Sequence, residues 1–385
     1  MGSNGLRANT SQRLENNVSL MEVACVDCQS LYPEEGVPFR CPACGGLFDF
    51  IDFPVFDPQR VNPKLPGMWR YKHAFGLPKD APLIYLGEGL TPLVKGEIDG
   101  HPVVFKLESS NPSGSFKDRG SAILVSILLS RRVSQVVEDS SGNAGASLAA
   151  YSARGGLNCR IFIPESASGP KLSQIEAYGA DLEAIHGSRL QAAEAVRQAA
   201  EMGTIYASHA YLPFGLPGYA TAAYEIVEQL SGTPGTVIVP AGHGNFLLGL
   251  ARGFLGMKKS GFIDHLPRLI GVQASACAPL WTVFTSGWKG LAQIAEGETL
   301  AEGIRVRNPA RIAAVLQAVQ STSGKFIVVN EEDILGSRDE LARQGLYVEP
   351  TSAVILPAFR QIVGRTPEPI VSLLTGSGLK YREEA

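Results

Sequence analysis

The sequence predicts an α/β protein with parallel-rich sheets. From about residue 100 onward, short runs rich in Val and Ile alternate with alanine-rich helical stretches. These short runs are apolar throughout rather than at every second position, which is typical of strands buried on both faces. Glycine-rich loops follow several of them, at the strand ends where parallel sheets bind ligands. These three observations together predict helices on both faces of a parallel sheet.

The expected elements follow from length, apolar pattern and flanking turn residues. Strands are expected at 103–108, 135–139, 159–164, 181–185, 236–240, 268–274, 326–330 and 369–375. Helices are expected at 119–132, 144–154, 170–178, 188–202, 218–231, 245–257, 308–320, 332–344 and 351–363.

The N-terminal part has a different composition. Residues 1–20 are polar and lack the apolar core of an export signal, which predicts a flexible N-terminus. Residues 21–50 contain two CxxC pairs, and four thiolates at this spacing predict a closed tetrahedral zinc site. The predicted metal ligands are Cys25, Cys28, Cys41 and Cys44. Residues 51–82 contain six prolines and predict an extended connector, with a short helix around Met68–Phe75.

Composition excludes several classes of protein. The chain has 385 residues, of which 45% are hydrophobic and 18% charged, an ordinary globular balance. A net charge of −3 supplies no field that would attract nucleic acid. No apolar run is long enough for a membrane span. Six cysteines are too few for a disulfide framework, which indicates a reducing, cytoplasmic location.

Four loops that follow expected strands are small, polar and rich in glycine. Backbone amides exposed by glycine at a helix start form a cradle for anions, and four such loops on one sheet point to a ligand site. Two common phosphate motifs are absent, because Leu247 stands where a dinucleotide fingerprint needs glycine and no GxxxxGK[ST] occurs. The loops are SNPSGSFKDRG (110–120), SSGNAG (140–145), PAGHGN (240–245) and TGSG (375–378).

In order and spacing, these loops resemble the fold type II pyridoxal-phosphate enzymes, the tryptophan synthase β family. The resemblance covers about residues 85–380, and LGEGLTPLV (86–94), AYEIVEQL (223–230), VEPTSAV (348–354) and TGSGLK (375–380) are most similar to threonine synthases. It implies a two-domain catalytic region over 83–385, with a smaller subdomain at about 121–210 inserted in the larger one. Many threonine synthases also carry an N-terminal zinc ribbon, as expected here for 21–50.

The resemblance also implies the roles of the site residues. Lys117 would bind pyridoxal 5′-phosphate through an imine and then serve as acid and base, work for which an amine of tuned pKa is suited. Asn143 would bind the 3′-oxygen of the cofactor, and Thr375 would donate to its pyridine nitrogen. The cofactor phosphate would lie on Gly242, His243, Gly244 and Asn245. The substrate amino acid would be bound by Ser115, Ser140, Ser141 and Gly142.

One segment departs from the family pattern. Threonine synthases commonly have Asn-Pro-aromatic-Arg-Leu-Glu-Gly-Gln-Lys-Thr, in which the arginine helps to bind the substrate phosphate. Here residues 212–221 have Gly215 in place of the arginine, Tyr219 in place of the glutamine and Ala220 in place of the lysine. A lost charge-assisted contact costs about 1.5–3 kcal/mol. Other cations could take over its role, the candidates being Arg119, Lys171 and Arg154.

Three functions follow. The first is a threonine-synthase-type lyase that converts O-phosphohomoserine and water to L-threonine and phosphate. The second keeps the cofactor and acts as a serine or threonine dehydratase, or as a β-replacement enzyme on an activated serine. The third is a nucleic-acid or partner-binding protein. The cysteine segment disfavours it, because Arg40 is the one basic residue between Cys25 and Cys44 and a surface that binds phosphates needs positive charge. The expected partners are a small amino-acid substrate and, by resemblance, a second copy of the chain in a homodimer, with neither nucleic acid nor membrane.

Overall fold

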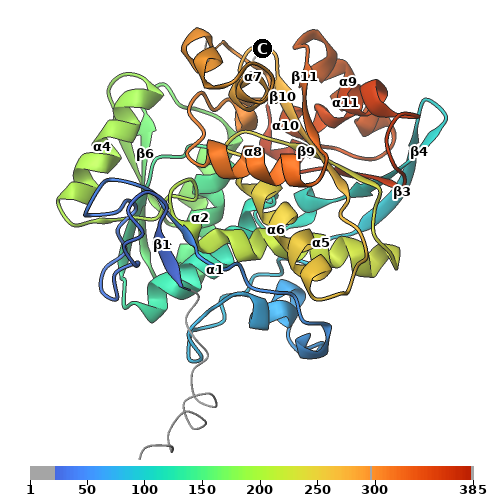
Figure 1. The fold of residues 1–385 in the computed structure, drawn as a ribbon. Coiled ribbons are helices and arrows are strands. Elements are labelled where there is room, and N and C mark those ends of the chain that lie inside the picture. The colour runs from blue at the N-terminus through green and yellow to red at the C-terminus, as the bar shows by residue number, and fades with distance from the viewer. Residues whose placement is uncertain (1–21, 295–296, 383–385) are drawn as a thin grey trace, which may run out of the picture.

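The computed structural model describes residues 22–294 and 297–382. The expected flexible segment at 1–20 lies outside these residues. The described chain forms three sheets, with two, six and four strands. Figure 1 shows the four-stranded sheet, in green, beside the larger one, and the cysteine segment, in dark blue, against its side. The parallel-rich α/β class expected from the sequence is confirmed.

The six-stranded sheet has the order β11-β10-β9-β12-β4-β3 and is parallel except for β3. Alternate residues of its strands enter two separate cores: Val237 and Val239 of β9 face one, and Ile238 faces the other. Helices α5, α6 and α8 contribute to the first core, and α9, α10 and α11 to the second. Its strands are β3 (Leu93–Ile98), β4 (His101–Lys106), β9 (Thr236–Pro240), β10 (Arg268–Ala274), β11 (Lys325–Val329) and β12 (Ile370–Leu373).

The four-stranded sheet has the order β7-β6-β5-β8 and is parallel throughout. Its strands are β5 (Gln135–Glu138), β6 (Asn158–Pro164), β7 (Asp181–Ile185) and β8 (Ile205–Tyr206). Helices α2, α3 and α4 pack on it, and α1 packs between α2 and α5. The two-stranded sheet is antiparallel and joins β1 (Val23–Cys25) to β2 (Phe48–Phe50).

In the described residues, helices lie where the sequence predicts them, and α7 is an addition. They are α1 (Lys117–Ser130), α2 (Asn143–Gly155), α3 (Pro170–Ala177), α4 (Arg189–Glu201), α5 (Leu216–Leu230), α6 (Asn245–Lys259), α7 (Pro279–Ser286), α8 (Ile312–Ser321), α9 (Glu332–Arg343), α10 (Pro350–Ala353) and α11 (Ile355–Ile362). The expected short helix in the connector is a 3-10 helix, Gly67–Ala74. None of the described helices is both long enough and apolar enough to span a bilayer.

The structure corrects the expected elements at a few places. The helix expected at 351–363 is two helices that meet at Val354, and Pro357 has no N–H to bond across that junction. The helix expected from 308 begins at Ile312, beyond Pro309. The expectation missed α7, β8 and the hairpin of β3 and β4, although Asp99-Gly100, both with positive φ, is a strong hairpin signal.

Candidate active site

The candidate active site lies where three helices begin. Helix α1 starts at Lys117, α2 at Asn143 and α6 at Asn245, each within one of the glycine-rich segments (Figure 1). The fourth loop, 375–378, follows β12. The first turn of a helix exposes backbone N–H groups without intrahelical partners, and these favour anionic ligands.

Hydrogen bonds join these loops although they are far apart in the sequence. The N–H of Phe116 donates to the carbonyl oxygen of Thr375 at 3.1 Å. The side-chain amide of Asn143 donates to Glu349 Oε1 at 2.8 Å, and the N–H of Glu349 donates to the carbonyl of Gly376 at 3.1 Å. The structure therefore places the lysine loop, the asparagine loop and the last loop side by side, as predicted.

Lys117 is the half-buried first residue of α1. Its Nζ lies 4.8 Å from the ring centroid of Phe116, and that ring stacks on Phe246 of α6 with centroids 4.4 Å apart. Burial lowers the pKa of the Lys117 amine to about 8, although the carboxyl groups of Glu138 and Glu349 oppose the shift. A lysine with a lowered pKa is a better nucleophile and a better base near neutral pH.

The PAGHGN loop is closely packed. Gly244 has a φ of +79°, and a Cβ there would lie 2.7 Å from Val315. A Cβ on Gly242 would lie 3.0 Å from the carbonyl oxygen of Gly303. Burial, reinforced by the charge of Lys117, lowers the pKa of His243 to about 3, so its imidazole is neutral. The loop therefore offers backbone amides and a neutral ring at the start of α6.

The other predicted site residues lie in the glycine-rich segments that meet near Lys117. Thr375 is buried, with its hydroxyl 3.2 Å from Ser352 Oγ. Ser140 is buried and its hydroxyl accepts the N–H of Gly142 at 3.3 Å. Ser141 is half-buried beside them, and Ser115 is buried at the end of the lysine loop.

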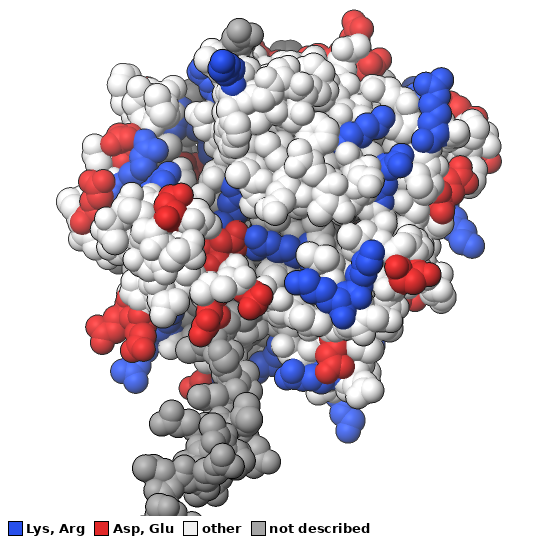
Figure 2. Space-filling view, in the orientation of Figure 1, with Lys and Arg blue, Asp and Glu red and all other residues white. Residues whose placement is uncertain are grey.

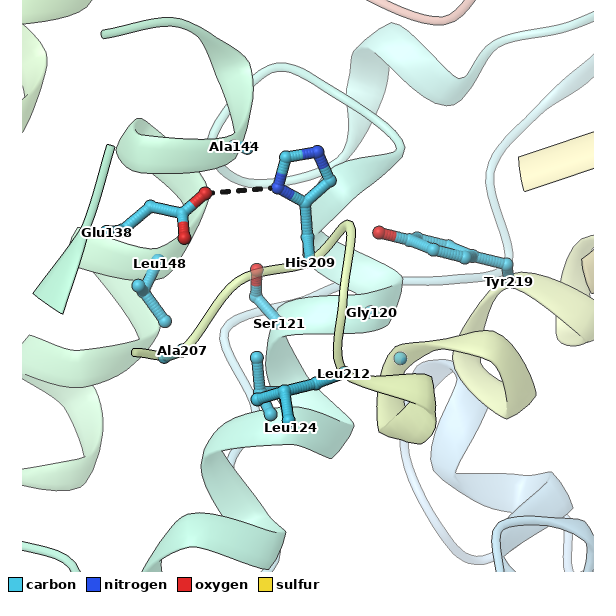
Figure 3. A pocket seen from close by; sticks show the side chains of 11 residues that line it. Gly120, Ser121, Leu124, Glu138, Ala144, Leu148, Ala207, His209, Leu212 and Tyr219 are labelled. Atoms are coloured by element: carbon cyan, nitrogen blue, oxygen red, sulfur yellow. Dashed lines mark hydrogen bonds and ion pairs between the residues drawn. The ribbon is translucent and has the colours of Figure 1, made fainter. Parts of the chain in front are cut away.

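Two ionisable residues at the site were missed by the sequence analysis. Glu138 ends β5, and His209 lies in the loop after β8; both line a small pocket together with Gly120, Gly215 and Tyr219 (Figure 3). His209 Nδ1 lies 3.1 Å from Glu138 Oε1. Glu138 sits two residues before the SSGNAG motif, which is a local signal, whereas nothing near His209 indicates its position in the site.

Glu349 was also missed as a site residue, although VEPTSAV was noted. It is buried, and its Oε2 lies 3.4 Å from Lys171 Nζ on the first turn of α3. Of the three candidate cations, Lys171 is therefore the one at the site. Arg119 is fully buried, with its guanidinium engaged in ion pairs of 2.7 Å with Glu108 and Glu225, and Arg154 is exposed.

The segment with the atypical residues packs tightly against α1. A Cβ on Gly215 would lie 3.2 Å from the Cα of Gly120, and a Cβ on Gly120 would lie 2.6 Å from the ring of Tyr219. A Cβ on Gly218 would lie 1.9 Å from the carbonyl oxygen of Arg119. Gly215, at the position where threonine synthases commonly have the arginine, therefore packs directly against the backbone of α1.

The four CxxC cysteines come together as predicted. Their sulfur atoms all lie within 4.8 Å of one another, with Cys25 Sγ 3.4 Å from Cys44 Sγ and Cys28 Sγ 3.6 Å from Cys41 Sγ. These separations are too long for disulfides. Four thiols at one point are the donor set of a structural zinc site, so the residues fit that ion.

The cysteine segment, residues 22–50, is anchored to the catalytic region by charged and aromatic contacts. Arg252 makes two bonds of 2.7 Å to the carboxylate of Asp49. Arg311 donates from one nitrogen to the carbonyls of Phe48 and Tyr211, at 2.8 and 2.7 Å. Side chains of both signs lie on the face drawn in Figure 2, in keeping with the small net charge.

The residues around Lys117 fit pyridoxal phosphate. Within the described chain, several buried polar atoms near the loops have no hydrogen-bond partner. They are Ser115 Oγ, Asn143 Oδ1, His243 Nδ1 and Asn245 Oδ1. Hydroxyl, amide and ring nitrogen groups beside an amine of lowered pKa and a helix N-terminus match an anionic aromatic aldehyde in chemistry.

Comparison with known proteins agrees with this chemistry. Residues 84–376 match the family described as pyridoxal-phosphate dependent enzyme. The chain is 34% identical to the threonine synthase of Methanocaldococcus jannaschii over 94% of its own length and 93% of that protein. It is 33% identical to the threonine synthase of Mycobacterium tuberculosis, over 85% and 92%. Among solved structures, it is similar in fold to maize serine racemase, with a TM-score of 0.65 and 22% identity, covering 75% of this chain and 88% of that one.

Proposed function

Because the chain belongs to the family of pyridoxal-phosphate dependent enzymes, we propose that it is a lyase of threonine-synthase type. Its reaction would convert O-phosphohomoserine and water to L-threonine and phosphate. The observation that carries this proposal is the position of Lys117, a lysine of lowered pKa at the start of a helix that faces the other three glycine-rich loops. Similarity to threonine synthases over nearly the whole chain supports the substrate.

The residues that would hold the cofactor come from all four loops. Lys117 would bind it through Nζ, Asn143 and Thr375 would bind polar atoms of its ring, and residues 242–245 would bind its phosphate at the start of α6. When bound, the cofactor supplies the electron sink that makes protons on the substrate carbons acidic. Lys117, released by the substrate amine, would then move those protons, since its pKa lies near neutral pH.

The substrate would be oriented by two groups of residues. Ser140, Ser141 and Gly142 precede the first turn of α2, where backbone N–H groups favour a carboxylate. Lys171 supports binding of the substrate phosphate, because it is the candidate cation at the site. Its ammonium group makes only loose contacts, 3.4 Å to Glu349 and 3.9 Å to Glu302, so that a phosphate dianion could draw it in.

One observation favours a second candidate function. The pocket beside Lys117 is lined by Gly215 in place of an arginine and by the carboxyl of Glu138, and neither attracts a dianion. A dehydratase acting on serine or threonine, or a β-replacement enzyme acting on an activated serine, would need no cation there. A panel of O-phosphohomoserine, serine, threonine and phosphoserine discriminates between the two candidates.

The test is direct. Purified holoenzyme given O-phosphohomoserine should release phosphate and threonine in equal amounts, and the absence of both would contradict the leading proposal. Borohydride reduction followed by peptide mapping should attach the cofactor to Lys117. Labelling at another lysine would overturn the site. The homodimer remains a prediction, which light scattering on the same preparation would test.

The second proposed cofactor is zinc, bound by the four cysteines. The support is the convergence of their sulfur atoms from two CxxC pairs. Metal analysis should give one zinc per chain, in keeping with a closed site of four thiolates. Cys44→Ser should lower that content, whereas Cys159→Ser should not, because Cys159 lies in β6 outside the cluster.

A further inference from the structure

The loop between β8 and α5 brings a histidine into the pocket beside Lys117. His209 is half-buried, and Figure 3 shows its imidazole with Nδ1 directed at Glu138 and the opposite edge turned away from that carboxyl. The pocket around the pair is lined by small or apolar groups, among them Gly120, Ala144 and Leu148. Of the histidines in the described chain, His209 and His243 are the two whose pKa responds to the charge of Lys117.

Three contacts hold His209 in place. Asn245, the first residue of α6, donates from Nδ2 to the carbonyl oxygen of His209 at 2.7 Å. The ring of His243 lies edge-on to the ring of His209, with centroids 5.7 Å apart. The third contact is the hydrogen bond of 3.1 Å to Glu138, which ends β5 immediately before the SSGNAG loop. The imidazole is therefore tied to two of the loops that build the active site.

We propose that His209 is a second acid–base residue of this enzyme, which takes the proton from the water that adds to the substrate, and that Glu138 is the residue that positions it. The proposal rests on the proposed threonine-synthase function. In the tautomer that this proposal requires, Nδ1–H donates to Glu138 Oε1, and the lone pair of Nε2 is then free to accept a proton.

The charges around the pair are consistent with this role. Burial, together with Lys117, His243 and Arg189, keeps the pKa of His209 well below its usual value, so the ring is neutral before water adds to the substrate. Burial and the neighbouring Asp139 raise the pKa of Glu138 well above its usual value, against the pull of Arg189 and Lys117. A neutral pair is less costly to bury than an ion pair.

The step balances as follows. Departure of the phosphate breaks the bond between the γ-carbon and oxygen, and the phosphate takes the electron pair. Lys117 takes the proton of the α-carbon, transfers a proton from the β-carbon to the γ-carbon, and returns a proton to the α-carbon at the end of the reaction. Water then forms the new carbon–oxygen bond at the β-carbon while its proton goes to Nε2 of His209. Nε2 then passes this proton to the released phosphate, which needs one proton to become hydrogen phosphate, so His209 is again neutral and the overall charge is unchanged over a turnover.

The product mixture of a His209→Gln variant tests the proposal. Without a base for the water, the substrate that has lost phosphate should instead hydrolyse to 2-oxobutanoate and ammonia. We expect the ratio of threonine to 2-oxobutanoate to fall by about tenfold or more, within the range of general acid–base effects. Phosphate release should change much less. His186→Gln is the matched control, because His186 forms a similar pair with Glu165 at 2.7 Å but is 93% exposed at the surface.

A second set of variants distinguishes the loss of the role of His209 from a loss of folding. Glu138→Gln keeps an oxygen that can accept the Nδ1 proton, so we expect it to retain the wild-type product ratio, whereas Glu138→Ala should lower the ratio as His209→Gln does. Nitrogen-15 NMR of the imidazole, which does not depend on turnover, should show Nδ1 protonated in the wild type and in Glu138→Gln, but not held in that form in Glu138→Ala.

The outcomes separate the two proposals. A wild-type protein that releases no phosphate from O-phosphohomoserine overturns the proposed function and this inference with it. A wild type that makes threonine, beside a folded His209→Gln that makes it in the same ratio, overturns the role of His209 alone. A ring protonated at Nε2 in the wild type overturns it as well, because the accepting nitrogen would then be blocked.

Discussion

The cysteine segment and the Lys117 site are assembled from very different distances along the chain. All four cysteines of the cluster lie within residues 25–44, and one short antiparallel pair of strands, β1 and β2, flanks them. The Lys117 site joins loops near residues 117, 143, 209, 243, 349 and 375, which come from both large sheets.

This difference decides what each region depends on. A local site needs a short hairpin, so its failure should remain local. A site made from remote loops depends on the packing of whole helices, since each loop is placed by the element that follows it. Changes in the helices behind the loops should therefore damage the second site more than changes in the cysteine segment do.

The largest effect is expected from Lys117→Ala. Removing the amine removes both the bond to the cofactor and the base for the substrate protons, so activity should fall by about a thousandfold or more. The variant should also lose the absorbance of the bound cofactor. Lys79→Ala, at an exposed position of the connector, is the control and should keep both. Retained activity in Lys117→Ala would mean that the loops around Lys117 do not form the active site.

The next effect concerns the packing behind α1. Arg119 is fully buried and joins Glu108 to Glu225, while Lys106 bonds to Glu225 at 2.7 Å. Arg119→Met leaves buried carboxylates without their partner, so the free energy of unfolding should fall by about 3–5 kcal/mol. Urea unfolding of the wild type and the variant measures this difference in the free energy of unfolding.

Arg360→Met is the matched control for Arg119. Arg360 also binds two carboxylates, Asp99 and Glu340, but the pairs are exposed and should contribute only about 0–1 kcal/mol. Equal losses in the two variants would mean that the buried ion network does not support the site.

The sequence predicted the two regions unequally well. The convergence of the four cysteines could be predicted, because CxxC spacing fixes the local geometry of each pair. The glycine-rich loops could be predicted too, since each is a local pattern after a strand. His209 could not, because it enters the site only through the placement of a loop between β8 and α5, and β8 itself has only two residues. The tight contact of Gly120 with Tyr219 is likewise a long-range fact, invisible in either segment alone.

The lowered pKa of Lys117 predicts that the fraction of its amine free to react rises by about tenfold per pH unit below that pKa. In the apoprotein, the amine loses its proton with a midpoint of about 8 rather than at the usual value, because burial disfavours the charged form. Acetylation of Lys117 should therefore rise between about pH 6 and pH 8 and level off above, while acetylation of a lysine in a short model peptide keeps rising toward about pH 10. Peptide mapping by mass spectrometry separates Lys117 from Lys380, whose pKa burial also lowers to about 8. A midpoint near that of the model peptide would mean that the remote loops do not enclose the amine.

The smallest effect on activity is expected from the cysteine segment, and it tests whether the two regions are independent. If the cluster binds zinc as proposed, Cys44→Ser should weaken that binding and disorder the hairpin. The segment touches the loop that carries His209: Tyr32 packs on Phe214 with centroids 5.1 Å apart, and Phe39 packs on Tyr211. These contacts support the loop from outside, so activity should fall by less than about tenfold, the span of roughly one kcal/mol of lost packing. A loss as large as that of Lys117→Ala would show that the hairpin is part of the active site, because disorder at the cysteines would then have reached the reacting groups through residues 206–215.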